Sequence, residues 1–168
     1  MCGKNKKNLL IINRNESDRK SLCSLLDDVY NVIEAGEIYV GKAFLEDGSK
    51  TVSAILLNPS DSLPATEAFL KFMRGRASFS AIPVLLLADD NVAEEIKLLG
   101  DGAVDCIEKP YRKEIILNRI ANAILLGDSI SLQGIERMLK QLPSLIYLKH
   151  SDARYVFCTH YWHHLKRP

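Results

Sequence analysis

The stretch TVSAILLNPSD, residues 51–61, decides the fold of this chain. Within it, residues 53–57 form a short apolar run without charge, which is typical of a strand buried on both faces of a sheet. Pro59 has no backbone N–H to donate and restricts the residue before it, so the strand should end at Asn58. In an open α/β sheet, ligands bind at the carboxyl edge of the strands. What this chain does therefore depends on Asn58.

Four other segments, before and after this run in the sequence, are also predicted to be strands. Segments whose apolar residues have the spacing of a helix alternate with them. Strands are predicted at residues 9–12, 30–35, 53–57, 82–87 and 103–107. Helices are predicted from Asn15 or Ser17 to about Val29, and at 36–47, 67–75, 91–99 and 112–126. Strict alternation with short loops gives a parallel sheet covered by helices on both faces. The predicted fold class is three-layer α/β, with residues 1–127 as one domain.

The apolar residues at helical spacing also predict which side chains face the core. For the first helix these are Leu22, Leu25, Leu26 and Val29; for the later ones they include Phe72, Leu99, Ile116 and Ile120. Such a stripe on one side of a helix is the usual core-facing pattern.

Composition and charge exclude several classes of function. The 168 residues carry 22 basic and 21 acidic side chains, so a net charge of +1 gives no general attraction to nucleic acid or to an anionic membrane. The four cysteines are scattered without CxxC spacing, which indicates reduced thiols rather than disulfides or zinc ligands. No signal peptide or membrane-spanning run is found, and we expect a cytoplasmic protein.

The remainder of the chain is predicted to contain a linker helix and a short tail. Residues 127–131 are rich in turn formers, and residues 128–142 then form the linker, with an apolar stripe at Ile135, Met138, Leu139 and Leu142. Two strands are predicted at 145–149 and 155–159. Residues 143–168 are too few to form a stable domain alone.

Four blocks of the first domain resemble a known family. LLIINRNESDRKSL, SAILLNPSD, IPVLLLADD and GAVDCIEKP are similar, in order and spacing, to the blocks of the response-regulator receiver domain (CheY-like) of two-component signalling. The resemblance covers residues 8–126. It implies a flavodoxin-like, doubly wound (βα)5 sheet with strand order 2-1-3-4-5. It also implies a cis peptide bond before Pro110.

The resemblance implies which residues would form the active edge, and most of them are replaced. An active receiver needs an acidic pair for Mg²⁺, a phosphoacceptor aspartate, a Thr or Ser, and a Lys. The corresponding residues are Asn13 and Arg14 (acidic pair), Asn58 (phosphoacceptor), Ala88 (hydroxyl) and Lys109 (lysine), with Cys106 in place of a switching aromatic residue. Only the lysine is retained.

The chemistry of these replacements argues against phosphoryl transfer. Mg²⁺ prefers carboxylate oxygens, and neither the Asn13 amide nor the Arg14 guanidinium supplies a negative charge. An amide nitrogen such as that of Asn58 is not a nucleophile for phosphoryl transfer, which relies on Mg²⁺. Deamidation of Asn58 by the usual route needs the N–H of the next residue, which Pro59 lacks. The sequence therefore predicts a degenerate pseudo-receiver with no metal, no cofactor and no enzymatic activity.

Two interpretations of the basic residues at this edge remain open. Arg14 and Lys109 either pair with nearby acids such as Asp61, Asp89 or Asp90, or form a cationic pocket that accepts an anion. We favour ion pairing, because paired arginines are common and need no ligand.

The tail resembles the beginning of a PAS domain, with a lead-in helix and two strands around an acidic turn. All four histidines, His150, His160, His163 and His164, lie there. His160 and His164 have a spacing that could share a metal with Cys158, but we favour a solvated or interface role.

These observations predict a phosphorylation-independent regulatory module of a multidomain, bacterial-type two-component or phosphorelay signalling protein. It would act by protein–protein interaction. The alternative is an anion or phosphometabolite sensor at the cationic edge. By analogy with receiver-plus-PAS architecture, the expected partners are adjacent domains such as a diguanylate cyclase or a histidine kinase. We also expect a homodimer, and neither nucleic acid nor membrane as a partner.

Overall fold

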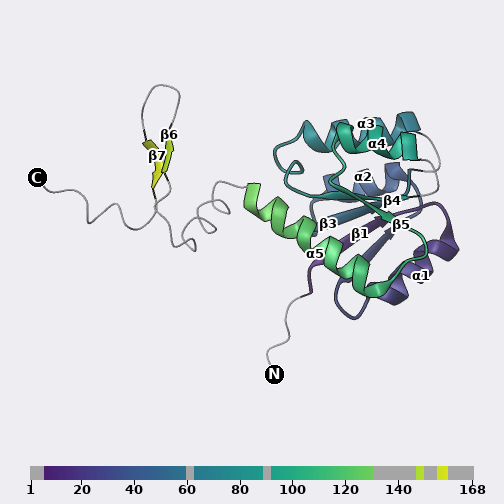
Figure 1. Cartoon of the computed structure of the whole chain (residues 1–168). Coiled ribbons are helices and arrows are strands. Elements are labelled where there is room, and N and C mark those ends of the chain that lie inside the picture. The colour runs from purple at the N-terminus through teal and green to yellow at the C-terminus, as the bar shows by residue number, and fades with distance from the viewer. Residues whose placement is uncertain (1–5, 60–62, 89–91, 131–146, 150–154, 159–168) are drawn as a thin grey trace, which may run out of the picture. The chain divides into compact units, whose positions relative to one another are not determined.

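A computed structural model describes residues 6–59, 63–88, 92–130, 147–149 and 155–158 (Figure 1). The chain divides into two compact units, Met1–Leu125 and Leu126–Pro168.

The first unit is built on a five-stranded parallel sheet. Its strands are β1 (Asn8–Ile12), β2 (Asn31–Ala35), β3 (Ala54–Leu57), β4 (Val84–Ala88) and β5 (Asp105–Glu108). They lie in the order β2-β1-β3-β4-β5, as the sequence predicted. The central strand β3 pairs with β1 and β4, and all four of its residues are fully buried. An uninterrupted apolar run suits this position because both faces of a parallel sheet are covered.

Five helices cover the two faces of the sheet. They are α1 (Glu16–Leu26), α2 (Ile38–Asp47), α3 (Leu63–Arg74), α4 (Val92–Asp101) and α5 (Lys113–Ile130). Helices α1 and α5 lie on one face, and α2, α3 and α4 lie on the other (Figure 1). The core accordingly has two halves, one on each side of the sheet. The three-layer, flavodoxin-like α/β prediction is confirmed.

Local signals set the elements that carry the sheet edge. Asn15 caps α1 with its side-chain oxygen, which accepts the backbone N–H of Asp18 at 3.1 Å. Helix α2 lies unusually close to β1 because Gly41 has no side chain. A Cβ atom at position 41 would lie 2.5 Å from Cδ1 of Ile12, a residue that is 2% exposed.

Several helix boundaries and core positions differ from the predictions. Helix α3 begins at Leu63 rather than at residue 67, because Pro64 is compatible with a first helical turn. Helix α5 continues to Ile130 through Gly127, where a break was predicted; a glycine inside a helix costs only about 1 kcal/mol. Leu98 rather than Leu99 is buried on α4, and Val29 lies beyond α1 and is 43% exposed.

The described part of the second unit contains an antiparallel strand pair. It consists of β6 (Tyr147–Lys149) and β7 (Tyr155–Cys158), with a bulge between Leu148 and Lys149. The part of the predicted linker helix beyond Ile130 and all four histidines lie outside the described residues. Among the helices that are described, none has the length and hydrophobicity needed to span a membrane.

Candidate functional site at the carboxyl edge of the sheet

The two asparagines predicted at the edge are brought together by adjacent parallel strands. Asn13 follows β1 and Asn58 follows β3. The backbone N–H of Asn58 donates to the carbonyl of Ile12 at 2.8 Å, and that of Asn13 donates to the carbonyl of Ala35 at 3.0 Å. Asn13 is 1% exposed and Asn58 is 7% exposed. The sheet therefore holds both amides in the interior of the edge.

A direct hydrogen bond joins the two amides. Nδ2 of Asn58 donates to Oδ1 of Asn13 at 3.2 Å, and the backbone N–H of Asn15 donates to the same oxygen at 2.9 Å. Nδ2 of Asn13 is buried and makes no hydrogen bond. The resemblance implies that, in an active receiver, carboxylates at these two positions would hold a metal and receive a phosphoryl group. Here the oxygen of Asn13 is already bound by two N–H donors, which a cation would have to displace.

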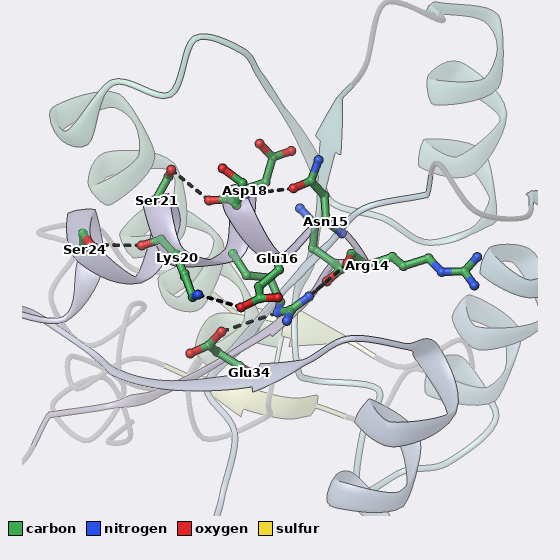
Figure 2. A network of polar contacts seen from close by, with 11 residues as sticks. Arg14, Asn15, Glu16, Asp18, Lys20, Ser21, Ser24 and Glu34 are labelled. Carbon is green, nitrogen blue, oxygen red and sulfur yellow. Dashed lines mark hydrogen bonds and ion pairs between the residues drawn. The ribbon is translucent and has the colours of Figure 1, made fainter.

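Arg14 is engaged in an ion pair. Figure 2 shows its side chain extended away from the polar network of α1, and the side chain is 66% exposed. Its Nε lies 3.3 Å from Oε1 of Glu37, which occupies the N-cap position of α2 without a side-chain capping hydrogen bond. Ion pairing is therefore observed, but with an acid on the β2–α2 connection. The predicted partners Asp61, Asp89 and Asp90 lie outside the described residues.

Lys109 is likewise bound to an acid. Its Nζ lies 2.7 Å from Oδ2 of Asp18 in the first turn of α1, with the side chains 40% and 24% exposed. The Lys109–Pro110 peptide bond is cis. Lys109, which the resemblance aligns with the lysine of an active receiver, is thus engaged by a carboxylate of the same chain.

The other two predicted positions belong to β4 and β5. Ala88 is the last residue of β4 and pairs with Glu108, and its side chain lies outside the described part. Cys106, on β5, is half-buried and packs against the half of the core under α2–α4.

Arg19 is a residue of the edge that the sequence reasoning missed. Its Nη1 donates to the backbone carbonyls of Asn13 at 2.7 Å and Arg14 at 3.1 Å, and its Nε lies 3.4 Å from Oε2 of Glu34. Figure 2 shows Glu34 among this network. Through these contacts, Arg19 connects helix α1 to the carboxyl ends of strands β1 and β2. No local pattern signals this role, because an arginine in the first turns of a helix is usually solvated.

A cavity of about 490 Å³ opens beside the asparagine pair, and it was not predicted. It lies between α2 and α3 at the carboxyl edge. Its lining includes Asn13, Arg14, Glu37, Lys42, Asn58, Ala65, Ala68 and Phe69. The volume falls in the range of small-molecule sites.

The described edge residues do not fit a magnesium ion. Mg²⁺ is bound through carboxylates and water in near-octahedral geometry. The two asparagines offer amides, and the nearby Glu37 and Asp18 are held by Arg14 and Lys109. Across the described residues, no three His, Cys, Asp or Glu side chains are grouped as metal ligands would be.

Comparison with known proteins identifies the fold. Neither a family model nor a curated protein matches the sequence. A response regulator from Thermotoga maritima matches with a TM-score of 0.61 at 21% identity, over 71% of this chain and 98% of that one. A receiver domain of a sensor histidine kinase from Pseudomonas aeruginosa, solved with magnesium in its active-site cleft, matches with a TM-score of 0.62 at 15% identity, over 71% and 98%. NtrX from Brucella abortus, in complex with ADP, matches with a TM-score of 0.66 at 17% identity, over 87% of this chain and 32% of that one.

These neighbours share one architecture, and it is that of the first unit. The first unit therefore has the fold of CheY-like receiver domains, such as those of the matched response regulators and histidine kinase.

Proposed function

We propose that this chain is a phosphorylation-independent receiver-like module that regulates a multidomain signalling protein by protein–protein interaction. The observation that carries the proposal is the hydrogen bond between the amides of Asn58 and Asn13. A phosphoacceptor and a metal ligand would have to occupy these two positions, and both are neutral amides that bind each other.

The remaining groups of the edge support the same proposal. Phosphoryl transfer depends on positioning and on neutralising the developing charge, to which Mg²⁺ contributes strongly. Arg14 would repel a cation placed near it, and Lys109 is paired with Asp18. We therefore propose that the module catalyses no reaction and that its state is set by contacts with other domains.

The predicted anion sensor at the cationic edge has less support. Each of its two cations lies within ion-pair distance of an acid, with Arg14 next to Glu37 and Lys109 next to Asp18. An entering anion would have to compete with a carboxylate at both positions.

The tail supports placement in a larger protein. The antiparallel β6–β7 pair accords with the beginning of a PAS domain, and we propose that such a domain follows the receiver unit. NtrX shows that a receiver fold occurs within a chain about three times the length covered here, since the match spans 32% of it. A diguanylate cyclase or histidine kinase as the regulated output rests on analogy of architecture.

A phosphodonor experiment tests the proposal. The wild-type chain, Asn58→Asp, and the triple variant Asn13→Asp/Arg14→Asp/Asn58→Asp are treated with acetyl phosphate and Mg²⁺, and intact mass is measured. We expect no phosphoryl adduct on the wild type. We expect little or no phosphoryl adduct on the single variant. Its new carboxylate lies beside Asn13, where no metal ion is bound to neutralise the charge that develops during phosphoryl transfer.

The triple variant restores the carboxylates that hold Mg²⁺, and it is the only one expected to form a Mg²⁺-dependent adduct. An adduct on the wild-type chain would refute the proposal. A Mg²⁺-dependent adduct on Asn58→Asp alone would show that Arg14 does not prevent metal binding.

A further inference from the structure

We propose that the cavity between α2 and α3 binds a small aromatic monocarboxylate. This inference goes beyond the proposed function, because it adds a chemical input to a module that no longer receives a phosphoryl group. The cavity shares Asn13, Arg14 and Asn58 with the carboxyl edge, but Lys109 does not line it.

The walls of the cavity favour a flat apolar body. Two alanines, Ala65 and Ala68, lie about one turn apart on α3 and leave open the space that larger side chains would fill. The side chains of Ile12 and Ile38 and the buried ring of Phe69 form further apolar surface. A site of about 490 Å³ with this lining accommodates one or two aromatic rings.

The polar end of the cavity favours a hydrogen-bond acceptor. Asn13 lines the cavity, and its buried Nδ2 makes no hydrogen bond within the protein. Lys42, which also lines it, carries only donors, whereas Arg14 is already paired with Glu37. Buried donors without partners are uncommon in folded proteins, and an oxygen of a ligand at this end would complete the set.

The charges of the cavity favour a single negative charge on the ligand. Among the lining residues that the structure describes, Arg14 and Lys42 contribute two positive charges and Glu37 one negative charge, which leaves a net charge of +1. Lys42 is held near the cavity by its position over the Phe72 ring, with Nζ 4.4 Å from the ring centroid. One carboxylate balances the net charge. A phosphate dianion carries more negative charge than the cavity's net charge of +1 would balance. It would also lie close to the Glu37 carboxylate and would leave the apolar walls of the cavity uncovered.

Chemical-shift mapping on the full ¹⁵N-labelled chain tests the proposal. The probes are benzoate, phenylacetate and indole-3-acetate, each titrated to about 10 mM, because fragments of this size bind with Kd on the order of 1 mM. At least one should give saturable shifts confined to residues 12–14, 36–42, 58 and 65–72. Benzamide, the neutral counterpart of benzoate, should bind at least about threefold more weakly, and inorganic phosphate should not shift these residues.

Variants separate this cavity from binding elsewhere. Ala68→Trp fills the cavity and should abolish the shifts, whereas Ala121→Trp, at an exposed position of α5, should not. Lys42→Met should weaken benzoate binding about threefold, and Glu37→Gln should strengthen it by a similar factor. Far-UV circular dichroism confirms that each variant is folded.

Three results would overturn the proposal. They are the absence of saturable shifts with all three carboxylates, equal binding of benzamide or phosphate, and unchanged binding in both Ala68→Trp and Lys42→Met. None of them bears on phosphorylation, which is read separately by mass, so failure of this inference and failure of the proposed function are distinguishable.

Discussion

The substitution Gly41→Ala sets two effects of similar size against each other. In the interior of a helix, alanine is more favourable than glycine by about 1 kcal/mol. At position 41, however, the new Cβ would lie 2.5 Å from Cδ1 and 2.9 Å from Cγ1 of Ile12, against an ordinary carbon–carbon contact of about 3.5–4.0 Å. Ile12 is 2% exposed and β-branched, so it cannot move away without repacking.

We expect the contact with Ile12 to prevail. An added methyl group in a packed core costs about 1–3 kcal/mol, so the free energy of unfolding should fall by about 1 kcal/mol after the helix-propensity gain is subtracted. For a domain of this size, that corresponds to a Tm lower by roughly 3–6 °C. Thermal unfolding followed by circular dichroism, together with urea titration, measures both quantities.

Two further variants make this result decisive. Gly100→Ala on α4 places its Cβ in open space and should raise the free energy of unfolding by about 0.5–1 kcal/mol. Ile12→Val removes Cδ1, so the double variant Gly41→Ala/Ile12→Val should be more stable than the sum of the single effects predicts. If Gly41→Ala raises Tm as much as Gly100→Ala does, the close packing of α2 on β1 is refuted.

Three other predictions concern the first unit. Asn13→Ala removes the acceptor that Asn58 and Asn15 share, and urea unfolding should show a loss of about 1–3 kcal/mol; no loss would mean that the amide pair is not formed. Burial, together with the nearby Glu34 carboxylate, raises the pKa of the Cys23 thiol to about 11, from 9.0. At pH 8 its thiolate fraction, and hence its rate of alkylation measured by peptide mapping, should be about 100-fold below that of an unperturbed thiol, and a rate like that of a free thiol would contradict this. We also predict self-association through α4, β5 and α5, which display five exposed apolar side chains at or next to them among the described residues (Leu99, Val104, Ile115, Leu125 and Leu126). Sedimentation at micromolar concentration should show a dimer that Val104→Glu/Ile115→Glu dissociates and that Val40→Glu on α2 does not; a monomeric wild type would contradict it.

The sheet could be predicted because its strands are buried on both faces. Runs such as residues 9–12 and 53–57 are apolar throughout, and Asn13 and Asn58–Pro59 end them clearly. The order of the strands and the meeting of Asn13 with Asn58 then followed from family resemblance. Burial on α5 was also predicted correctly at Ile116 and Ile120.

Helix registers were harder to predict because several helices have apolar residues on more than one side. Leu98 and Leu99 are adjacent on α4, and only the packing against the sheet decides that Leu98 is buried. Similarly, Val29 continues the spacing of α1, but the helix ends at Leu26 and leaves it 43% exposed.

The details of the site depend on contacts that are distant in sequence. Lys109 pairs with Asp18, 91 residues away, and Arg14 pairs with Glu37 on the next connection of the chain. The sequence interpretation considered only acids that follow strands, so it identified ion pairing without these partners. The cavity could not be predicted either, because it arises from the spacing of α2 and α3 and from two alanines that look unremarkable in the sequence.

The most direct test of the account is whether the carboxyl edge binds a divalent cation. Mn²⁺ replaces Mg²⁺ at oxygen sites and broadens the NMR signals of nearby nuclei, so a titration of the ¹⁵N-labelled wild-type chain with Mn²⁺ reports metal at the edge residue by residue. We predict that the amide signals of Asn13, Asn58 and Lys109 broaden no more than those of the distant Ala121, while the triple variant Asn13→Asp/Arg14→Asp/Asn58→Asp shows selective broadening at the edge. Selective, saturable broadening at Asn13 and Asn58 in the wild type, reversed by excess Mg²⁺, would contradict the account.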